Sequence, residues 1–363
     1  MPDGLWQDQA FDYDPLLVKA TRQSIFELDP QLDAALRDPA IANAPTPKRL
    51  EKLLLLVFGP DMKVFSYAGG RTTTAAETWR NRQGDCLSLT ILSQSLARRL
   101  NVTAQMQEVR VPVSFDRRYG VDFLNNHVNL VVRNHQRLEL KQRSLPAGEI
   151  VIDFEPQVGS TQRGEPLGDD AIVARYYNNV AAEKLAVGHD RSAYAHFKAA
   201  ILADPRYAAS YNNLAQLYLR ANLVPSAERL LRHAIALNNE SPLALSSLQR
   251  LLQSQGRSIE AEAIAQRLYA QRAKDPYHWL GVGLQHLREQ QYAEAVDALE
   301  RAQNLTRGFD EVHRYLAVAY WRNGQHEAAQ AQLARLTELN RDDPAIGKLN
   351  KKFSSLNAAP PVR

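Results

Sequence analysis

Hydrophobic residues change their spacing twice along this chain, and each change marks a different kind of predicted element. Residues 14–60 carry short helical patterns, of which the clearest runs over Lys48–Phe58 and ends at Gly59-Pro60. Residues 102–154 contain runs of β-compatible residues, some of them alternating between apolar and polar positions, which is typical of half-buried strands. Beyond residue 168 the spacing is helical again. This order predicts helices, then a sheet, and then an all-helical region.

The junction between the first two patterns contains the only cysteine of the 363 residues. Gly84 and Asp85 interrupt the preceding segment, and apolar residues then recur at helical spacing over 87–100. Cys86 is therefore expected in the first turn of a helix, near unpaired backbone N–H groups that lower the pKa of a thiol. A lone cysteine is also a small hydrophobic residue, so a buried and inert thiol is the alternative interpretation.

The second pattern predicts an antiparallel sheet behind the cysteine helix. A polar loop over 114–126 and a short turn around His135 separate its strand-like runs. These runs cover 102–113, 127–132, 137–140 and 149–154. His127 begins one run, whereas Asp153 closes an otherwise apolar run, where a carboxylate is costly unless it is exposed or paired.

A cysteine nucleophile needs a base within hydrogen-bond reach and a group that orients the base. His127 is preferred over His135 as the base for Cys86, because the start of a strand can lie against the cysteine helix while a turn is solvated. Asp153 would fix the tautomer of His127 and stabilise its imidazolium form. A strand-end carboxylate in water is the alternative interpretation of Asp153.

The segment before the cysteine supplies candidate donors for an oxyanion hole. Val64–Tyr67 is compatible with a short strand, and Thr74–Glu77 has the form of a capping box for a helix that contains Trp79. Beside the backbone N–H of Cys86, the candidate side-chain donors are Tyr67 and Trp79. Each of the two is equally compatible with a place in the hydrophobic core.

Beyond a polar candidate linker at 157–168, the helical pattern repeats every 34 residues. An alanine recurs at one phase in five copies, at positions 193, 227, 261, 295 and 329. A residue at the expected helix–helix turn, where positive φ is needed, recurs with it, as Gly188, Asn222, Gly256, Gln290 and Gly324. Five helix–turn–helix copies are therefore predicted over 169–355, with Ala345–Phe353 as a closing helix.

The period and its positions resemble the tetratricopeptide repeat family. Residues of the first copy that follow the family's pattern are Tyr177, Val180, Ala193, Phe197, Ala200 and Pro205. Lys184 departs from it, because an aromatic residue is usual there. The resemblance implies an all-α tetratricopeptide solenoid over 169–355, whose stacked helix pairs form a groove for a protein or peptide.

The order of cysteine, histidine and aspartate on helix, strand and strand resembles the transglutaminase-like branch of the papain-type cysteine enzymes. The motifs that carry this resemblance are Ala75–Trp79, Gly84–Ser88, Asn126–Val128 and Val151–Pro156. The resemblance implies an α+β papain/transglutaminase-like domain over 1–168, with Cys86 as nucleophile, His127 as base and Asp153 as orienting group. Active members of this family form an acyl-thioester from an amide, and water or an amine resolves it.

Two functions of different classes fit these features. The first is a cysteine-dependent acyl-transfer enzyme, a peptide or amide hydrolase or a transglutaminase-type enzyme, whose repeats recruit a protein or peptide substrate. The alternative is a catalytically silent scaffold in which the repeats mediate protein–protein interaction. The complete set of cysteine, histidine and aspartate favours the enzyme, since a domain without turnover need not retain all three.

Composition and charge narrow the classes of partner. The net charge is +4 and basic residues are interspersed with acidic ones, so a nucleic acid is not expected. Neither a cofactor nor a metal is expected, because the sequence lacks phosphate-loop, EF-hand and zinc-ligand spacings. The longest apolar run, Leu53–Phe58, is too short to span a bilayer. Without a leader the protein is expected to be soluble and cytoplasmic, or periplasmic or secreted if a leader was removed.

Overall fold

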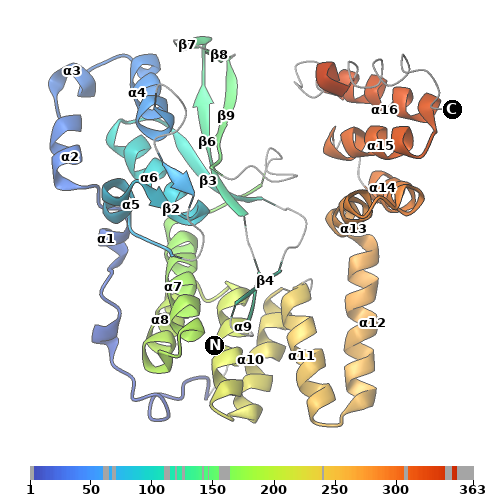
Figure 1. The fold of residues 1–363 in the computed structure, drawn as a ribbon. Coiled ribbons are helices and arrows are strands. Elements are labelled where there is room, and N and C mark those ends of the chain that lie inside the picture. Colours follow the sequence, from blue (N-terminus) through green and yellow to red (C-terminus); the bar gives the residue numbers. More distant parts are fainter. Residues whose placement is uncertain are drawn as a thin grey trace. The chain divides into compact units, whose positions relative to one another are not determined.

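The structure is a computed structural model of the chain, and most of its elements are helices (Figure 1). It describes residues 4–59, 65–67, 71–109, 115–118, 121–124, 127–140, 143–145, 147–154, 164–238, 241–305, 310–339 and 346–349. The chain forms two compact units, Met1–Ala265 and Gln266–Arg363. The first unit contains the strands and the first repeats, and the second contains the later repeats.

Short helices, most of which have a proline in the first turn, form the first part of the first unit. They are η1 (Pro15–Leu17), α1 (Arg22–Phe26), α2 (Pro30–Leu36), α3 (Pro39–Ala42) and α4 (Thr46–Phe58). Asp14 and Asp29 accept hydrogen bonds from backbone N–H groups at the starts of η1 and α2, as N-caps before proline do. Gly59 ends α4 with a φ of 67°, which a side chain would disfavour.

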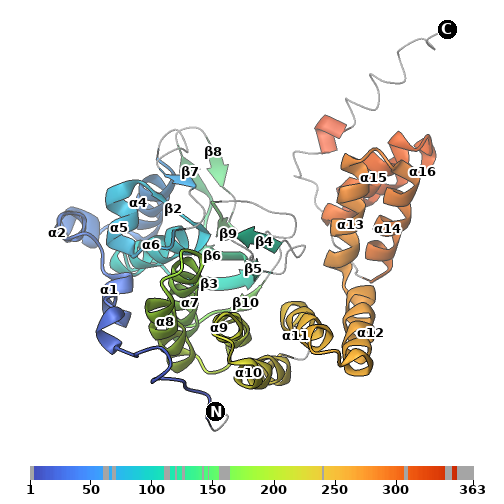
Figure 2. The same cartoon turned by 60° about the horizontal axis from the view of Figure 1, so that its bottom comes forward.

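An antiparallel sheet with a helix packed against it follows (Figure 2). The strand order is β10–β3–β6–β9. These strands are β3 (Ala104–Val109), β6 (His127–Asn134), β9 (Gly148–Ile152) and β10 (Glu165–Pro166). The helix is α6 (Cys86–Arg99), preceded by α5 (Ala75–Asn81) and by the parallel pair β1 (Ser66–Tyr67) and β2 (Gln83–Gly84). Each predicted strand-like run therefore contains an observed strand.

The expectation of a polar loop over 114–126 is wrong. This segment contains β4 (Phe115–Arg118) and β5 (Val121–Leu124), which pair as antiparallel strands. The register pairs Phe115 with Leu124 and Arg118 with Val121. The segment contains aromatic and β-branched residues, which favour strands. Its charged residues led to the prediction of a loop.

Two other expectations about the sheet also need correction. The candidate linker at 157–168 supplies β10, which extends the sheet beyond β3; its residues 157–163 lie outside the described part of the chain. The predicted run at 137–140 forms β7 (Leu138–Leu140), which pairs with β8 (Arg143–Leu145) in a separate two-stranded sheet. In both cases the pairing depends on a distant strand or on register, which the local pattern does not reveal.

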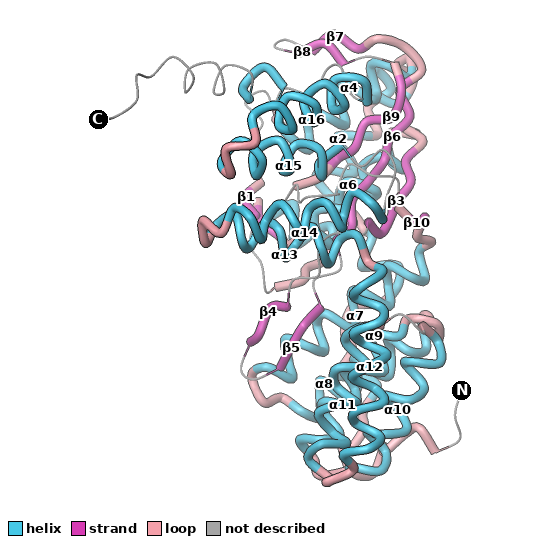
Figure 3. The backbone as a smooth tube through the Cα atoms, turned by 90° about the vertical axis from the view of Figure 1, so that its right-hand side faces the viewer, coloured by secondary structure: helices cyan, strands magenta, loops and turns pink. Residues whose placement is uncertain are grey.

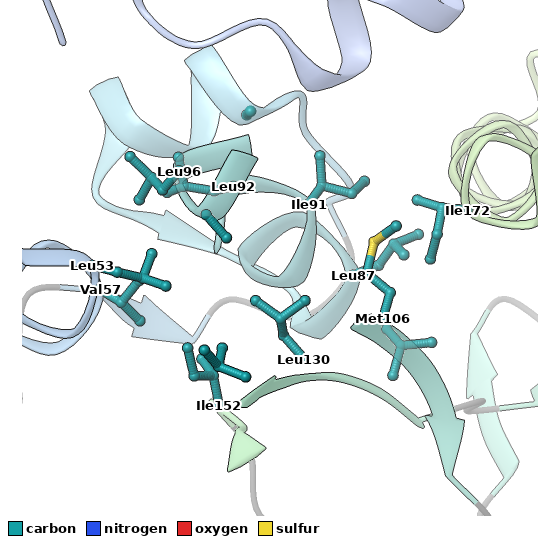
Figure 4. Packing of buried hydrophobic residues seen from close by; sticks show 14 of the residues in the cluster. Leu53, Val57, Leu87, Ile91, Leu92, Leu96, Met106, Leu130, Ile152 and Ile172 are labelled. Carbon is teal, nitrogen blue, oxygen red and sulfur yellow. The ribbon is translucent and has the colours of Figure 1, made fainter. Parts of the chain in front are cut away.

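A hydrophobic core lies between α6 and the sheet, and Figure 4 shows part of it. Leu87, Ile91, Leu92 and Leu96 recur at helical spacing on the face of α6 that packs there. Members from other elements are Leu53 and Val57 of α4, Met106 of β3, Leu130 of β6 and Ile152 of β9. The register pairs Leu130 with both Met106 and Ile152, so the three strands present one apolar row to the helix.

The first repeat helix, α7 (Asp169–Ala186), belongs to the same compact unit as the sheet. Ile172 of this helix lies in the core of α6 and the sheet. Arg98 of α6 forms an ion pair with Asp169, and Arg175 of α7 bonds Glu108 of β3 at 2.6 Å. The domain boundary between residues 168 and 169 stays a prediction, and the compact unit around it extends to Ala265.

The repeat region consists of successive helices joined by short loops (Figure 3). After α7 come α8 (Asp190–Ala203), α9 (Ala208–Arg220), α10 (Val224–Leu237), α11 (Pro242–Ser254), α12 (Ser258–Lys274), α13 (Pro276–Arg288), α14 (Tyr292–Leu305), α15 (Asp310–Arg322) and α16 (His326–Leu339). All five residues at the predicted turn phase have positive φ, between 59° and 81°. That prediction is confirmed. Of the predicted closing helix, residues 346–349 are helical and the remainder lies outside the described residues.

The segment before η1 lies across α8 and α9, a contact that no local pattern predicts. Phe11 stacks on Tyr194 of α8 and Tyr218 of α9, with ring centroids 4.7 and 5.6 Å apart. The Tyr218 hydroxyl donates to the carbonyl oxygen of Leu5 at 2.8 Å, and the Tyr194 hydroxyl donates to Asp8 Oδ1 at 2.7 Å. The chain's first described residues therefore form part of the packing of the early repeats.

Replacing Gly283 with valine is expected to destabilise the second unit by about 1–3 kcal/mol, as overpacking of a core does. A Cβ atom on Gly283 of α13 would lie 2.5 Å from Cγ of Leu299 on α14, so the two helices would have to separate. Urea denaturation measures the loss. The control is Gly324→Asn, because Asn222 already occupies the same turn phase with a φ of 59°. Equal stability of the valine variant and wild type would contradict this close packing.

Candidate functional site

The lone cysteine is the first residue of α6, as the sequence predicts. Asp85 is the N-cap: its Oδ1 accepts hydrogen bonds from the backbone N–H of Ser88 at 2.7 Å and from the Ser88 hydroxyl at 2.6 Å. The Cys86 side chain is largely buried, with 9% of its surface exposed. Gly84 is required just before it, because a Cβ there would lie 2.9 Å from the Cβ of Ser88.

His127 and Asp153 come together at the end of the sheet. His127 is the first residue of β6 and Asp153 directly follows β9. Nε2 of His127 lies 2.6 Å from Oδ2 of Asp153, and the two side chains are 1% and 7% exposed. A carboxylate accepts the proton at this distance, so Nε2 carries the hydrogen and Nδ1 carries the lone pair of the neutral ring.

The other ring nitrogen of His127 is buried without a hydrogen-bond partner among the described residues. A buried polar atom of this kind is costly and calls for a functional or solvent partner. Because the Nε2 proton is held by Asp153, Nδ1 is the atom that can take a proton from a thiol or return one to a leaving group. The pair therefore has the chemistry of an oriented base.

The start of α6 and the start of β6 lie at the same end of the helix–sheet pair. β3 returns along the sheet after α6, and β6 is antiparallel to β3, so β6 runs in the direction of α6. The Thr90 hydroxyl donates to the carbonyl oxygen of Val128 at 3.4 Å. Cys86 is one helical turn before Thr90, and His127 is one residue before Val128. The fold thus places the first turns of α6 beside the start of β6. The approach of the Cys86 thiol to His127 and the catalytic roles of the three residues stay predictions.

Two polar residues that sequence reasoning missed support the pair. Asn129 donates from Nδ2 to Oδ2 of Asp153 at 3.3 Å, and Gln107 donates from Nε2 to Oδ1 of Asn129 at 3.0 Å. Both amides are buried, and the register places Gln107 opposite Asn129. Polar residues at alternate positions of β6, beginning with His127, were the available sequence signal, because alternate residues share one face of a strand.

The two candidate oxyanion donors occupy different environments. Tyr67 lies on β1 with 41% of its surface exposed. Trp79 lies on α5, where the guanidinium of Arg82 stacks over its ring at 3.6 Å and Phe65 packs beside it at 6.1 Å. His135, the less favoured base, lies exposed directly after β6, as predicted for a turn. The oxyanion roles of Tyr67 and Trp79 stay predictions.

A second candidate site is a hollow of about 380 Å³ in the second unit, which we call the arginine hollow. Its lining residues are Leu287, Arg288, Gln290, Tyr292, Val318 and Arg322. Arg288 and Arg322 end successive first helices of two repeats and are both exposed. No ion pair or hydrogen bond of either guanidinium occurs among the described residues.

The corresponding arginine of an earlier repeat does have an acidic partner. Arg220 occupies the same repeat phase on α9, and its guanidinium bonds Asp190 at 2.9 Å, thirty positions earlier in the chain. It also donates to the carbonyl oxygen of Leu185 at 2.7 Å. The residues thirty positions before Arg288 and Arg322 are Ser258 and Tyr292, and neither carries a charge. Arg288 and Arg322 therefore lack an acidic residue at the position where Arg220 has Asp190.

Metal ligands and membrane-spanning helices are two further features that bear on function. Within the described ranges, no group of three or more His, Cys, Asp or Glu side chains is placed to hold a metal ion. Of the helices that the structure describes, none combines the length and the apolar character needed to cross a membrane.

Comparison with known proteins identifies the repeats. Residues 286–352 match the family model of the tetratricopeptide repeat. The chain contains tetratricopeptide repeats. That match does not extend to residues 60–157, which carry the resemblance to transglutaminase-like enzymes, so a transglutaminase-like domain is not shown. No curated protein matches the chain.

Solved structures of tetratricopeptide proteins are similar to part of the chain. A MamA protein is 20% identical to this chain, and the match covers 47% of this chain and 92% of the MamA chain. YrrB, a TPR protein with an unusual peptide-binding site, is 18% identical, and the match covers 49% of this chain and 92% of the YrrB chain. A thermophilic TPR protein in Thermus thermophilus is 19% identical, and the match covers 51% of this chain and 100% of that protein's chain. The TM-score is 0.26 in each case.

Proposed function

We propose that this protein is a scaffold whose tetratricopeptide repeats bind a protein or peptide partner. Stacked helix pairs support this, because they present an extended surface along which a partner segment can lie. The family match covers the last repeats, and the helix pairs continue with the same turn geometry back to residue 169. Protein–protein interaction through the repeats was the alternative to an enzymatic function in the sequence-based interpretation, and the comparisons favour it.

The observation that carries this proposal is the pair of arginines in the arginine hollow. A guanidinium binds a carboxylate or a phosphate through parallel N–H groups, and Arg288 and Arg322 lack an acid of their own among the described residues. Leu287 and Val318 add an apolar part to the same lining. The hollow therefore suits a partner segment in which an acidic side chain stands beside an apolar one.

Replacing both Arg288 and Arg322 with glutamate is expected to weaken the binding of an acidic peptide by roughly tenfold or more, which corresponds to about 1.4 kcal/mol. The reason is that two attractive charges become repulsive. The measurement is fluorescence anisotropy with a labelled peptide of glutamate and leucine, against a peptide with glutamine in place of glutamate. Binding by wild type should weaken with added salt.

The matched control for this experiment is Arg335→Glu. Arg335 lies in the same unit, is exposed and pairs with Glu338 outside the arginine hollow. This variant changes the net charge of the unit without touching the lining. An equal loss in the control would mean that general attraction, not the hollow, binds the peptide. If wild type bound the glutamate and glutamine peptides equally, the proposed acidic partner would be wrong.

A second candidate function, cysteine-dependent acyl transfer, is favoured by the buried His127–Asp153 pair. In this proposal Nδ1 of His127 takes the thiol proton of Cys86, and the sulfur attacks an amide carbonyl carbon. The C–N bond then breaks as His127 returns the proton to the leaving nitrogen. Water would complete a hydrolase cycle, and an amine would complete a transglutaminase-type cycle.

Under this second candidate the repeats recruit the protein or peptide whose amide is attacked. Its test is the rate at which Cys86 reacts with iodoacetamide at neutral pH, relative to a free cysteine, and the dependence of that rate on His127. A scaffold without turnover would keep its partner binding after Cys86→Ser. If the protein is an enzyme, Cys86→Ser should abolish product formation and leave partner binding unchanged.

A further inference from the structure

A partly buried hydrogen-bond network joins α7, the first repeat helix, to the start of the cysteine helix. Oε1 of Glu183, on α7, accepts a hydrogen bond from the backbone N–H of Thr72 at 2.6 Å. The Thr72 hydroxyl donates to Oδ2 of Asp85 at 2.5 Å. Asp85 is the N-cap of the helix whose first residue is Cys86, and its other oxygen holds Ser88. A single threonine therefore links Glu183 to the N-cap beside the thiol.

Two carboxylates share this network, and their proximity affects the charge of Glu183. Burial is the main cause that raises the pKa of Glu183 to about 7, and the charge of Asp85 raises it as well. The N–H and hydroxyl of Thr72 and the charge of Lys184 act in the opposite direction. Glu183 is therefore neutral in mildly acidic solution and negative in mildly basic solution.

Other titratable groups around Glu183 belong to α7 and α5. Tyr176 lies on α7, and burial is the main cause that raises its pKa above the usual range; the charges of Glu77 on α5 and of Glu183 contribute. Lys184 follows Glu183 in the chain and is the one cation among the groups that act on its pKa. The surroundings are therefore mostly acidic, so a negative charge on Glu183 adds to charges of the same sign.

We infer that Glu183 is a positioning residue for the Cys86 thiol, acting through Thr72 and Asp85, and that the first tetratricopeptide repeat thereby takes part in setting the reactivity of the cysteine. The inference rests on the second candidate function, a reactive Cys86. When Glu183 is neutral, Thr72 holds Asp85 in place as the N-cap. When Glu183 is negative, its charge and that of Asp85 lie on either side of Thr72, and together they disfavour a third negative charge, the thiolate.

The test is the alkylation rate of Cys86 by iodoacetamide from pH 6 to pH 8.5 in the full chain. Glu183→Gln keeps an oxygen acceptor for the N–H of Thr72 and removes the titration. The variant is expected to react at the wild-type rate near pH 6 and roughly two- to tenfold faster at pH 8, since one pKa unit in the thiol is a factor of ten. Glu294→Gln, at an exposed position of α14, is the matched control and should follow wild type.

Stability gives a second measurement that does not depend on the thiol. The pKa of the Glu183 carboxyl is near the ordinary glutamate value of 4.5 in the unfolded chain and about 7 in the folded one, so stability is lost as the pH rises between these values. Glu183→Gln should flatten this part of the stability curve. Thr72→Val, which removes the hydroxyl link to Asp85, should abolish the effect of Glu183→Gln on the alkylation rate.

The outcomes separate the inference from the function on which it rests. A reactive Cys86 whose pH profile is identical in wild type and Glu183→Gln would overturn the inference and leave the second candidate function standing. A wild-type thiol no faster than free cysteine at every pH would overturn both. Additive effects of Thr72→Val and Glu183→Gln would show that the two act separately, which also contradicts the inference.

Discussion

Replacing His127 with alanine is expected to slow the alkylation of Cys86 at neutral pH by roughly 10²-fold, at the low end of what a positioned base contributes. The thiolate is the form that reacts, and Nδ1 of His127 is the buried nitrogen left to accept the thiol proton. Mass spectrometry of the alkylated chain measures the rate. Since Cys86 is the only cysteine, all label reports on one site.

Two variants make this experiment interpretable. His135→Ala removes an exposed imidazole just after the same strand and should leave the rate unchanged. Asp153→Asn keeps the shape of the side chain that holds Nε2 but removes its charge, so the rate should fall between wild type and His127→Ala. Equal rates in His127→Ala and wild type would exclude His127 as the base for Cys86.

The local parts of the candidate site could be predicted from the sequence. Gly84 and Asp85 before an apolar-periodic run indicate a helix start, and α6 begins at Cys86 with Asp85 as its cap. A carboxylate at the end of an apolar run is costly unless it is exposed or paired, which makes Asp153 a candidate partner for a histidine. The structure places Asp153 against His127. These predictions depend on short stretches of chain and on side-chain chemistry.

The parts that depend on pairing could not be predicted. Asn129 and Gln107 support Asp153 only because the β3–β6 register sets them opposite each other, and register is not visible in either strand alone. The same limit explains why the local pattern predicts a linker where β10 forms and a loop where β4 and β5 pair. The link from Glu183 to Thr72 spans 111 positions, so no local pattern could indicate it.

The segment before η1 is the clearest case of packing without a sequence pattern, and it yields the largest expected change in stability. The ring of Phe11 is 6% exposed and packs against two fully buried tyrosines, Tyr194 and Tyr218. Stacked aromatic pairs add to the stability that burial alone provides. Both tyrosine hydroxyls bond this segment, so loss of the ring would also loosen two buried polar groups.

Phe11→Ala is accordingly expected to destabilise the first unit by about 3–5 kcal/mol, the usual cost of removing a buried phenylalanine ring. Hydrogen exchange of peptides from α8 and α9 measures this in the full chain, because it reports on the first unit alone. Leu16→Ala is the control: Leu16 lies just beyond the same segment but is 81% exposed, so its loss should change stability by less than about 0.5 kcal/mol. If exchange in α8 and α9 were as slow in Phe11→Ala as in the control, the segment would rest on the repeats without stabilising them. Faster exchange in Phe11→Ala alone would make the N-terminal segment a structural part of the first two tetratricopeptide repeats.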